Sequence, residues 1–299
     1  MIERAEVDFP DRGKGAPKRY EHRRGGSDRW WHSRRRYVFL VHGFKSPEAG
    51  AQVNYAGFRQ CLQSKVDSTL DELVYVIWPG DQRAASVPDY GASIEVAEAV
   101  APYFVDFLTG DFEEIAPTAE VVFVAHSLGC LLLLETLVLL ARHPEHNKRP
   151  ITVMLMAAAV PVSTVGRSGR LRSALAGEKR TSYVLYSPRD WVLNWPFRPG
   201  HWLKHPNDGF MPEAVGLRGQ PASDTWRDQW HMEGHGHNDY WSSGYVAERV
   251  AQVLAEKPSG RDLPERALHE RELARSSQLA ATQTCRLDRT LPRRASPRR

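Results

Sequence analysis

The sequence predicts an α/β protein with a mostly parallel, doubly wound β-sheet and helices on both faces of that sheet. Short apolar segments typical of buried strands alternate along the chain with segments of helical periodicity, which is the pattern of parallel strands joined by helical crossovers. Polar residues with reactive side chains follow directly after several of these strands. The carboxyl ends of parallel strands are where such sheets form their sites, so the sequence favours an enzyme.

The expected strands and helices follow from this alternation. Apolar segments rich in β-branched and aromatic residues predict strands at 37–41, 73–78, 121–124, 151–156 and 181–186. Helices are expected at 49–66, from about 93 onward, after 128, at 168–176 and at 242–255. Pro102 should bend or shorten the second of these helices. Residues 191–241 contain six Trp and are interpreted as a long loop or lid-like insertion.

Charge divides the chain into three parts. Residues 1–36 carry 11 Lys and Arg against 6 Asp and Glu, and residues 285–299 carry 6 Arg against one Asp, so within a total of +4 the residues between them have a net charge of about −6. We expect a basic, mostly extended arm at 1–36, an α/β domain at 37–257, and a polar helix with a disordered Arg-rich tail at 258–299. The basic ends could make weak contact with an anionic surface, but they indicate no specific nucleic-acid partner.

The apolar runs, the N-terminal residues and the cysteines together predict a cytoplasmic protein. The longest apolar run lacks the ~20 residues that span a bilayer, and the N-terminus lacks the apolar core of a secretory signal. Cys61, Cys130 and Cys285 have neither disulfide nor metal spacing. Cys130 is expected to pack as a helix residue beside the central turn. The sequence does not determine the oligomeric state.

A strand–turn–helix segment carries the main candidate site. The strand at 121–124 is followed by residues 125–129, a small-x-Ser-x-small pattern, and then by a helix that is apolar on nearly every face. Small residues are needed there because the chain reverses direction within a few residues. The turn should point the Ser127 hydroxyl at solvent beside the free N–H groups of the helix. Ser127 is therefore a predicted nucleophile, although it could also be only a helix N-cap.

A serine nucleophile needs an imidazole as its base and a carboxylate that orients the imidazole. In a hydrolase built on a doubly wound sheet, the acid follows the nucleophile and the histidine comes last. Asp190, which follows the strand at 181–186, is the predicted acid; its alternative role is that of a turn or N-cap residue. His237 is the predicted base because it lies in a Gly-His-Asn loop before the final helix, and His235 is the alternative base. The reserve candidates are Asp208, Asp224 and Asp239 as acids and His231 as a base.

An oxyanion would need two backbone N–H donors. One is Leu128, the residue after the nucleophile. The other is expected from the loop after the first strand, where Gly43 lets the backbone approach closely, and Phe44 is the predicted donor. His42 is interpreted as a structural turn residue.

Five motifs in this order resemble the α/β-hydrolase superfamily, close to a bacterial esterase/lipase-like group. They are FLVHGF at 39–44, IWPG at 77–80, AHSLG at 125–129, YSPRDW at 186–191 and GHNDYW at 236–241. The resemblance implies the α/β-hydrolase fold and hydrolysis of a small-molecule or lipid ester, without a cofactor or metal. It further implies a Ser127, Asp190, His237 triad acting through an acyl-enzyme, with Phe44 and Leu128 as oxyanion donors. Ala125 replaces a commoner Gly. No strand pair is evident before Tyr37, so a trimmed sheet is expected.

Two other functions stay open. His235-x-His237-x-Asp239 resembles the first half of the metallo-β-lactamase motif His-x-His-x-Asp-His, and His231 adds a nitrogen, as a metal-dependent hydrolase would need. However, Tyr240 stands where that motif has its last His. The chain could also be a hydrolase fold retained as a catalytically silent binding module, although such a module has no need for the complete order of Ser, Asp and His.

Overall fold

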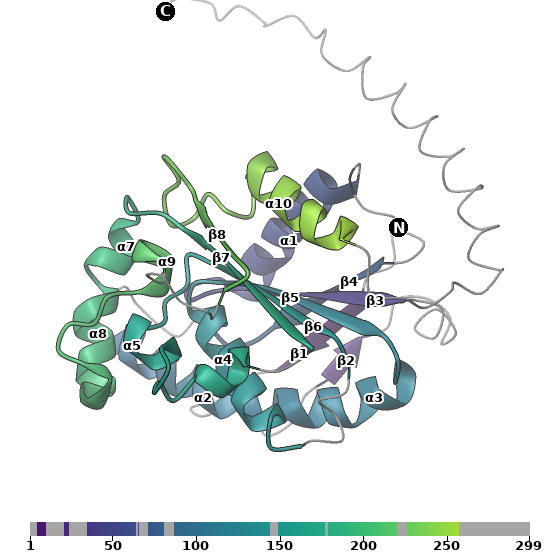
Figure 1. Ribbon diagram of the computed structural model, residues 1–299, viewed down its shortest axis with the longest axis horizontal. Helices are drawn as coiled ribbons and strands as arrows, with labels where there is room; N and C mark the ends of the chain where they lie inside the picture. Colours follow the sequence, from purple (N-terminus) through teal and green to yellow (C-terminus); the bar gives the residue numbers. More distant parts are fainter. Residues whose placement is uncertain are drawn as a thin grey trace, which may run out of the picture.

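The computed structural model describes residues 5–9, 21–23, 35–63, 65, 71–80, 87–143, 149–176, 179–219 and 226–256. These residues contain one sheet of eight strands in the order β2-β1-β4-β3-β5-β6-β7-β8 (Figure 1). The strands are β1 Ala5–Asp8, β2 Glu21–Arg23, β3 Arg36–Val41, β4 Asp71–Ile77, β5 Glu120–His126, β6 Ile151–Met156, β7 Arg180–Tyr186 and β8 Asp228–His231. Only the β1–β2 pair is antiparallel. The predicted doubly wound, mostly parallel sheet is confirmed.

Helices cover both faces of the sheet, as parallel strands require. They are α1 Glu48–Gln63, α2 Val87–Thr109, α3 Asp111–Ile115, α4 Leu128–Leu140, α5 Val162–Val165, α6 Arg172–Leu175, α7 Trp191–Asn194, α8 Phe197–Lys204, α9 Val215–Arg218 and α10 Gly244–Ala255, with a 3-10 helix, η2, at Pro206–Asp208. Figure 1 shows α1 and α10 on one face and α2, α3 and α4 on the other, while α7 and α8 lie at one end of the molecule.

The trimmed sheet expected from the sequence is wrong. β1 pairs with β4 and β2 pairs with β1, so two strands precede β3 and extend that edge of the sheet. Their sequence signal is weak because both are short and charged. Val7 and Phe9 nevertheless supply buried apolar side chains, and Phe9 contacts Phe104 of α2 edge to face. Residues 5–8 form a strand because they pair with β4, which lies far along the chain.

Two further expectations differ from the structure. The Trp-rich segment 191–241 is not a plain loop, since it contains four helical pieces and β8, which continues the sheet beyond β7. In addition, α2 begins before residue 93 and continues through Pro102 to Thr109, so this proline does not end the helix. The expected 258–299 helix and tail, and most of the 1–36 arm, lie outside the described residues.

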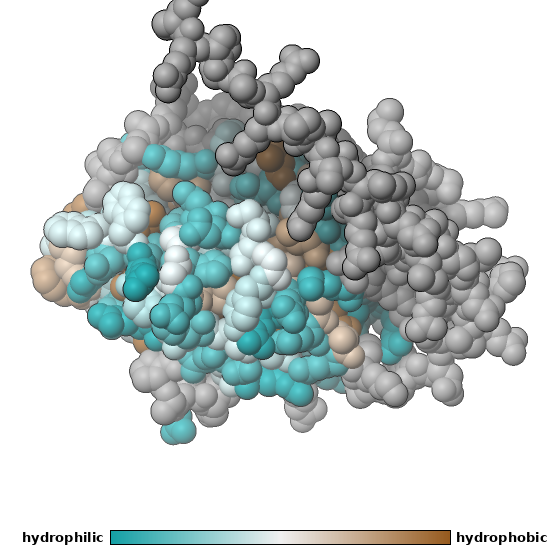
Figure 2. Space-filling model, turned by 90° about the horizontal axis from the view of Figure 1, so that it is seen from above, coloured by the Kyte–Doolittle hydropathy of each residue, from teal (hydrophilic) through white to brown (hydrophobic). Residues whose placement is uncertain are grey.

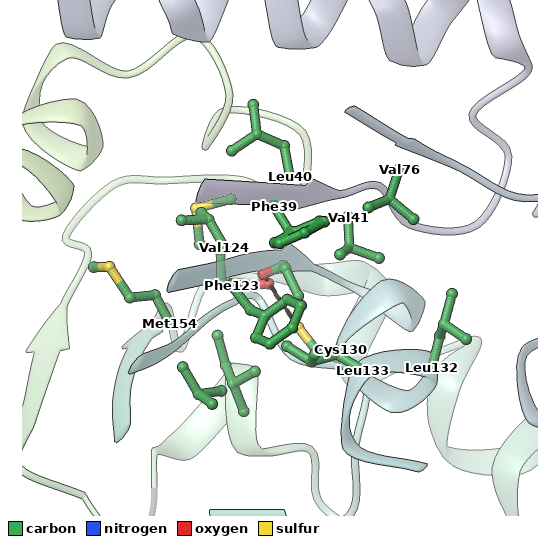
Figure 3. Packing of buried hydrophobic residues seen from close by; sticks show 14 of the residues in the cluster. Phe39, Leu40, Val41, Val76, Phe123, Val124, Cys130, Leu132, Leu133 and Met154 are labelled. Carbon is green, nitrogen blue, oxygen red and sulfur yellow. Dashed lines mark hydrogen bonds between the residues drawn. The ribbon is translucent and has the colours of Figure 1, made fainter. Parts of the chain in front are cut away.

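The core between the sheet and α2, α3 and α4 is built around aromatic side chains. Phe39 of β3 contacts Phe104, Phe112 and Phe123 at ring-centroid distances of 5.2 to 6.2 Å. Figure 3 shows Phe39 and Phe123 from neighbouring strands together with Cys130, Leu132 and Leu133 of α4. The helix is buried on nearly all sides, which explains why its sequence is apolar all round. Among the described residues, no helix is long and apolar enough to cross a membrane.

Phe39→Ala should lower the free energy of unfolding by about 3–5 kcal/mol, because it leaves a cavity between β3, α2 and α3. Val53→Ala is the matched control: Val53 is 70% exposed on α1, and its truncation should change stability by less than ~0.5 kcal/mol. Urea unfolding followed by circular dichroism measures both values. Equal losses in the two variants would contradict this description of the core.

Candidate active site

Ser127 occupies a strained turn between β5 and α4. Its backbone has φ 53° and ψ −124°, a combination that non-glycine residues rarely adopt. The turn packs against the loop after β3 so closely that a Cβ on Gly129 would lie 2.1 Å from the His42 carbonyl oxygen. A Cβ on Gly43 would lie 2.6 Å from the Ser127 Cβ. The expected need for a small residue is therefore confirmed at Gly129, and the facing loop needs one at Gly43 as well.

Ser127 is less open to solvent than the sequence led us to expect. The residue is only 4% exposed, so the expectation of a hydroxyl pointing at solvent is wrong in this structure. Its backbone N–H donates to the Met156 carbonyl and its carbonyl accepts from the Ala159 N–H. These two bonds hold the turn to the carboxyl end of β6, because a buried backbone must find its partners within the protein.

The structure brings Ser127, His237 and Asp190 together from three distant parts of the chain. His237 Nε2 lies 2.8 Å from Ser127 Oγ, and His237 Nδ1 lies 2.7 Å from Asp190 Oδ2. A carboxylate can only accept, so Nδ1 carries the proton and donates a hydrogen bond to Asp190. Nε2 is then free to accept from the Ser127 hydroxyl. This order of donors and acceptors is the one needed to remove a proton from the serine.

The Asp190 carboxylate accepts hydrogen bonds from two partners. One oxygen, Oδ2, accepts from His237, while the other, Oδ1, accepts from the Leu193 N–H at 3.1 Å and caps the N-terminus of α7. The residue is fully buried. The N-cap role weighed from the sequence therefore applies, and the same side chain also contacts the His237 imidazole. The cap fixes the carboxylate plane, which in turn fixes the orientation of the imidazole.

The remaining candidates have other partners. The alternative base His235 is turned away from Ser127, with its Nε2 2.9 Å from the hydroxyl of Ser243, the N-cap of α10. His231 stacks on Tyr186. Across the described part of the chain, no group of three or more His, Cys, Asp or Glu is arranged to hold a metal ion, so the structure does not assemble the histidine cluster considered above.

The reserve acids do not reach the imidazole either. Asp208 pairs with His201 at 2.9 Å, and Asp239 Oδ2 accepts from the Gly236 N–H at 2.7 Å. Asp224 lies outside the described residues.

The loop that carries His237 is held by two side chains that sequence reasoning did not single out. His126 Nε2 donates to the His237 carbonyl oxygen at 2.7 Å, and Ser187 Oγ donates to the His235 carbonyl oxygen at 2.7 Å. His126 ends β5 and precedes Ser127, and Ser187 follows β7 three residues before Asp190. That position was the available signal, because side chains at strand ends are the ones able to reach a loop that crosses the sheet edge.

His126 and His42 are neutral, buried imidazoles on either side of the turn. Burial lowers the pKa of His126 to about 3, with nearby His237 adding to this effect. Burial likewise lowers the pKa of His42 to about 4. His42 stacks on Trp78, whose indole N–H donates to the His42 carbonyl oxygen at 2.9 Å. Its expected role as a structural turn residue agrees with these contacts.

The two predicted oxyanion donors directly follow Ser127 and Gly43 in the chain. Leu128 is the first residue of α4, where the N–H groups of a helix have no partner within the helix, and Phe44 follows Gly43, the residue in contact with the Ser127 side chain. Within the described residues, neither N–H donates one of the backbone hydrogen bonds of turns and loops. Cys130 packs one turn further on, as expected, and its thiol donates to the Ala125 carbonyl oxygen (Figure 3).

Comparison with known proteins places residues 30–196, more than half of the chain, in a family described as an alpha/beta hydrolase of unknown function (DUF900). A search of curated proteins found no match. Solved structures with a similar fold include an esterase of Pyrobaculum calidifontis, 15% identical with a TM-score of 0.39, covering 75% of this chain and 76% of that one. Another is the RedJ thioesterase of Streptomyces coelicolor, 14% identical with a TM-score of 0.40, covering 75% and 86%. These distant likenesses carry no argument about activity.

The buried imidazoles predict a loss of stability in acid. Below their ordinary pKa of 6.5 the unfolded chain takes up protons on His42 and His126, whereas the folded chain does not until the pH approaches about 4 and 3. The unfolded state then binds more protons, so the free energy of unfolding should fall by several kcal/mol as the pH drops through this window. His126→Gln should flatten part of that decline in urea titrations at a series of pH values. An unchanged slope would exclude His126 as a contributor.

Proposed function

The chain belongs to this alpha/beta hydrolase family, and we propose that it is a serine hydrolase that cleaves a carboxylic ester of a small or lipid-like substrate. One observation carries the proposal: the hydrogen bonds from Ser127 Oγ to His237 Nε2 and from His237 Nδ1 to Asp190 Oδ2, both under 3 Å. Together they form a path along which the serine proton can leave. A serine nucleophile with a histidine base favours acyl transfer over other reactions supported by the same fold.

In the first half-reaction, Ser127 Oγ attacks the ester carbonyl carbon while His237 Nε2 takes the hydroxyl proton. Asp190 stabilises the resulting imidazolium through the Nδ1 hydrogen bond. The tetrahedral intermediate then collapses, the carbon–oxygen bond to the alcohol breaks, and His237 returns its proton to the departing alkoxide. In the second half-reaction, water attacks the acyl-enzyme with His237 again as the base, which releases the acid and restores Ser127.

The negative charge on the carbonyl oxygen needs donors that are already in place. We assign the Leu128 N–H at the start of α4 and the Phe44 N–H in the loop after β3 to this role. Gly43 supports the assignment, because the absence of a side chain there lets the backbone just before Phe44 lie against Ser127. Fixed donors of this kind stabilise the oxyanion without reorganising during the reaction, and losing one typically costs a factor of about 10²–10³ in turnover.

A fluorophosphonate probe should label Ser127, and Ser127→Ala should abolish both the labelling and the hydrolysis of p-nitrophenyl esters. The reason is that the probe reacts only with a hydroxyl that a base has activated. Peptide mapping by mass spectrometry locates the adduct. Labelling that survives the substitution would place the nucleophile elsewhere. A folded wild-type chain that neither labels nor hydrolyses any ester would favour the catalytically silent binding module.

His237→Ala and Asp190→Asn should each reduce turnover by several orders of magnitude, through loss of the base and of the group that orients it. His235→Gln is the matched control. It lies in the same loop but its ring faces Ser243, so turnover should stay within a few-fold of the wild type. Steady-state kinetics with a short-chain p-nitrophenyl ester measures all three, with circular dichroism to check folding. An inactive His235→Gln beside an active His237→Ala would reverse the choice of base.

A further inference from the structure

The largest exposed apolar side chains gather in one short segment. Among the described residues six large hydrophobic side chains are exposed, and four of them lie between residues 191 and 210. They are Trp191 at 66%, Trp195 at 72%, Leu203 at 65% and Phe210 at 74% exposure; we call them the aromatic surface. Figure 2 shows apolar and weakly polar residues at the end of the molecule where Figure 1 places α7 and α8. Single exposed apolar residues are ordinary, whereas a group of this kind indicates a binding surface.

Several contacts make these residues part of one end of the molecule. Trp191 and Trp195 are one helical turn apart, joined by the hydrogen bond from the Trp195 N–H to the Trp191 carbonyl, so they share a face. Phe210 is tied to α8 by an edge contact with Trp202, at a centroid distance of 4.9 Å. The Arg198 side chain also donates to the Met211 carbonyl at 3.0 Å.

The inner side of the same segment is attached to the domain by several polar side-chain pairs. His205 contacts Glu98 of α2 at 2.7 Å, Lys204 pairs with Glu95, and Asp208 pairs with both His201 and Arg170. The exposed side chains are therefore presented by an anchored element. Leu193 and Phe197 of the same segment are buried, so apolar packing as well as these pairs holds it to the domain while the four exposed side chains stay in solvent.

The charged residues near the aromatic surface indicate which kind of partner it binds. Between residues 189 and 211 both carboxylates are occupied internally, Asp190 by His237 and Asp208 by His201 and Arg170. Lys204 is paired with Glu95. Two arginines, Arg189 and Arg198, lie within three residues of a tryptophan along the chain, and Arg198 also donates to the Met211 carbonyl. Tryptophan at the water boundary with arginine next to it is the composition of surfaces that bind phospholipid headgroups.

We propose that the aromatic surface binds the surface of a phospholipid bilayer, with Trp191, Trp195, Leu203 and Phe210 entering the headgroup region and Arg189 and Arg198 contacting lipid phosphates. Because α7 starts at its N-cap Asp190, the bilayer would lie beside the candidate site. This proposal rests on the proposed function, and under it the substrate is an ester held in or near a lipid surface.

The test measures vesicle binding without turnover. The Ser127→Ala protein is mixed with vesicles of equal parts phosphatidylcholine and phosphatidylglycerol, and bound protein is quantified by co-sedimentation. In this background Trp195→Ser and Phe210→Ser should each weaken binding about tenfold, the value of removing one partly buried aromatic side chain from the lipid. Val53→Ser, equally exposed but on α1, should bind as the parent does. Every variant keeps the basic termini, so their contribution cancels.

A second readout fixes the location. Brominated phosphatidylcholine should quench part of the tryptophan fluorescence of the parent, and the double substitution Trp191→Phe and Trp195→Phe should remove most of that quenching while keeping binding. Equal vesicle binding by Trp195→Ser, Phe210→Ser and Val53→Ser, or quenching unchanged in the double variant, would overturn the proposal and leave a protein partner for this surface. Esterase activity of the Ser127 form is measured separately, so the hydrolase can stand while the lipid surface fails.

Discussion

The site depends on how closely the turn after β5 packs against the loop after β3. A methyl group at position 129 would overlap the His42 carbonyl oxygen, and one at position 43 would overlap the Ser127 side chain. This close packing holds Ser127 in a backbone conformation that a serine rarely adopts. The same packing brings the start of α4 and the loop after β3 to the two sides of one hydroxyl.

The His237 imidazole is positioned in a different way, by hydrogen bonds to the backbone of the loop that carries it. His126 and Ser187 hold the carbonyl oxygens of His237 and His235, and Asp239 caps the Gly236 N–H. A loop with two glycines would otherwise have many conformations available. This arrangement buries His126 as a neutral imidazole beside the site, so the free energy of unfolding depends on pH. Positioning and acid sensitivity thus have the same origin in His126.

The segment from α7 to η2 joins the site to the molecular surface. Its first residue follows Asp190, its inner side pairs with α2 through His205 and Lys204, and its outer side carries the exposed tryptophans. Only a few residues separate α8, which packs on α2, from the Asp190 carboxylate.

The sequence by itself determined the alternation of strands and helices, the turn at Ser127 and a candidate order of Ser127, Asp190 and then His237 or His235, because periodicity and local turn chemistry depend on neighbouring residues. It could not reveal β1, β2 and β8, whose short polar segments become strands only by pairing with strands distant in the chain. Nor could it separate His237 from His235, two residues apart in the same loop. Tertiary structure decided that choice, since the loop's hydrogen bonds to His126 and Ser187 direct one ring toward Ser127 and the other toward Ser243.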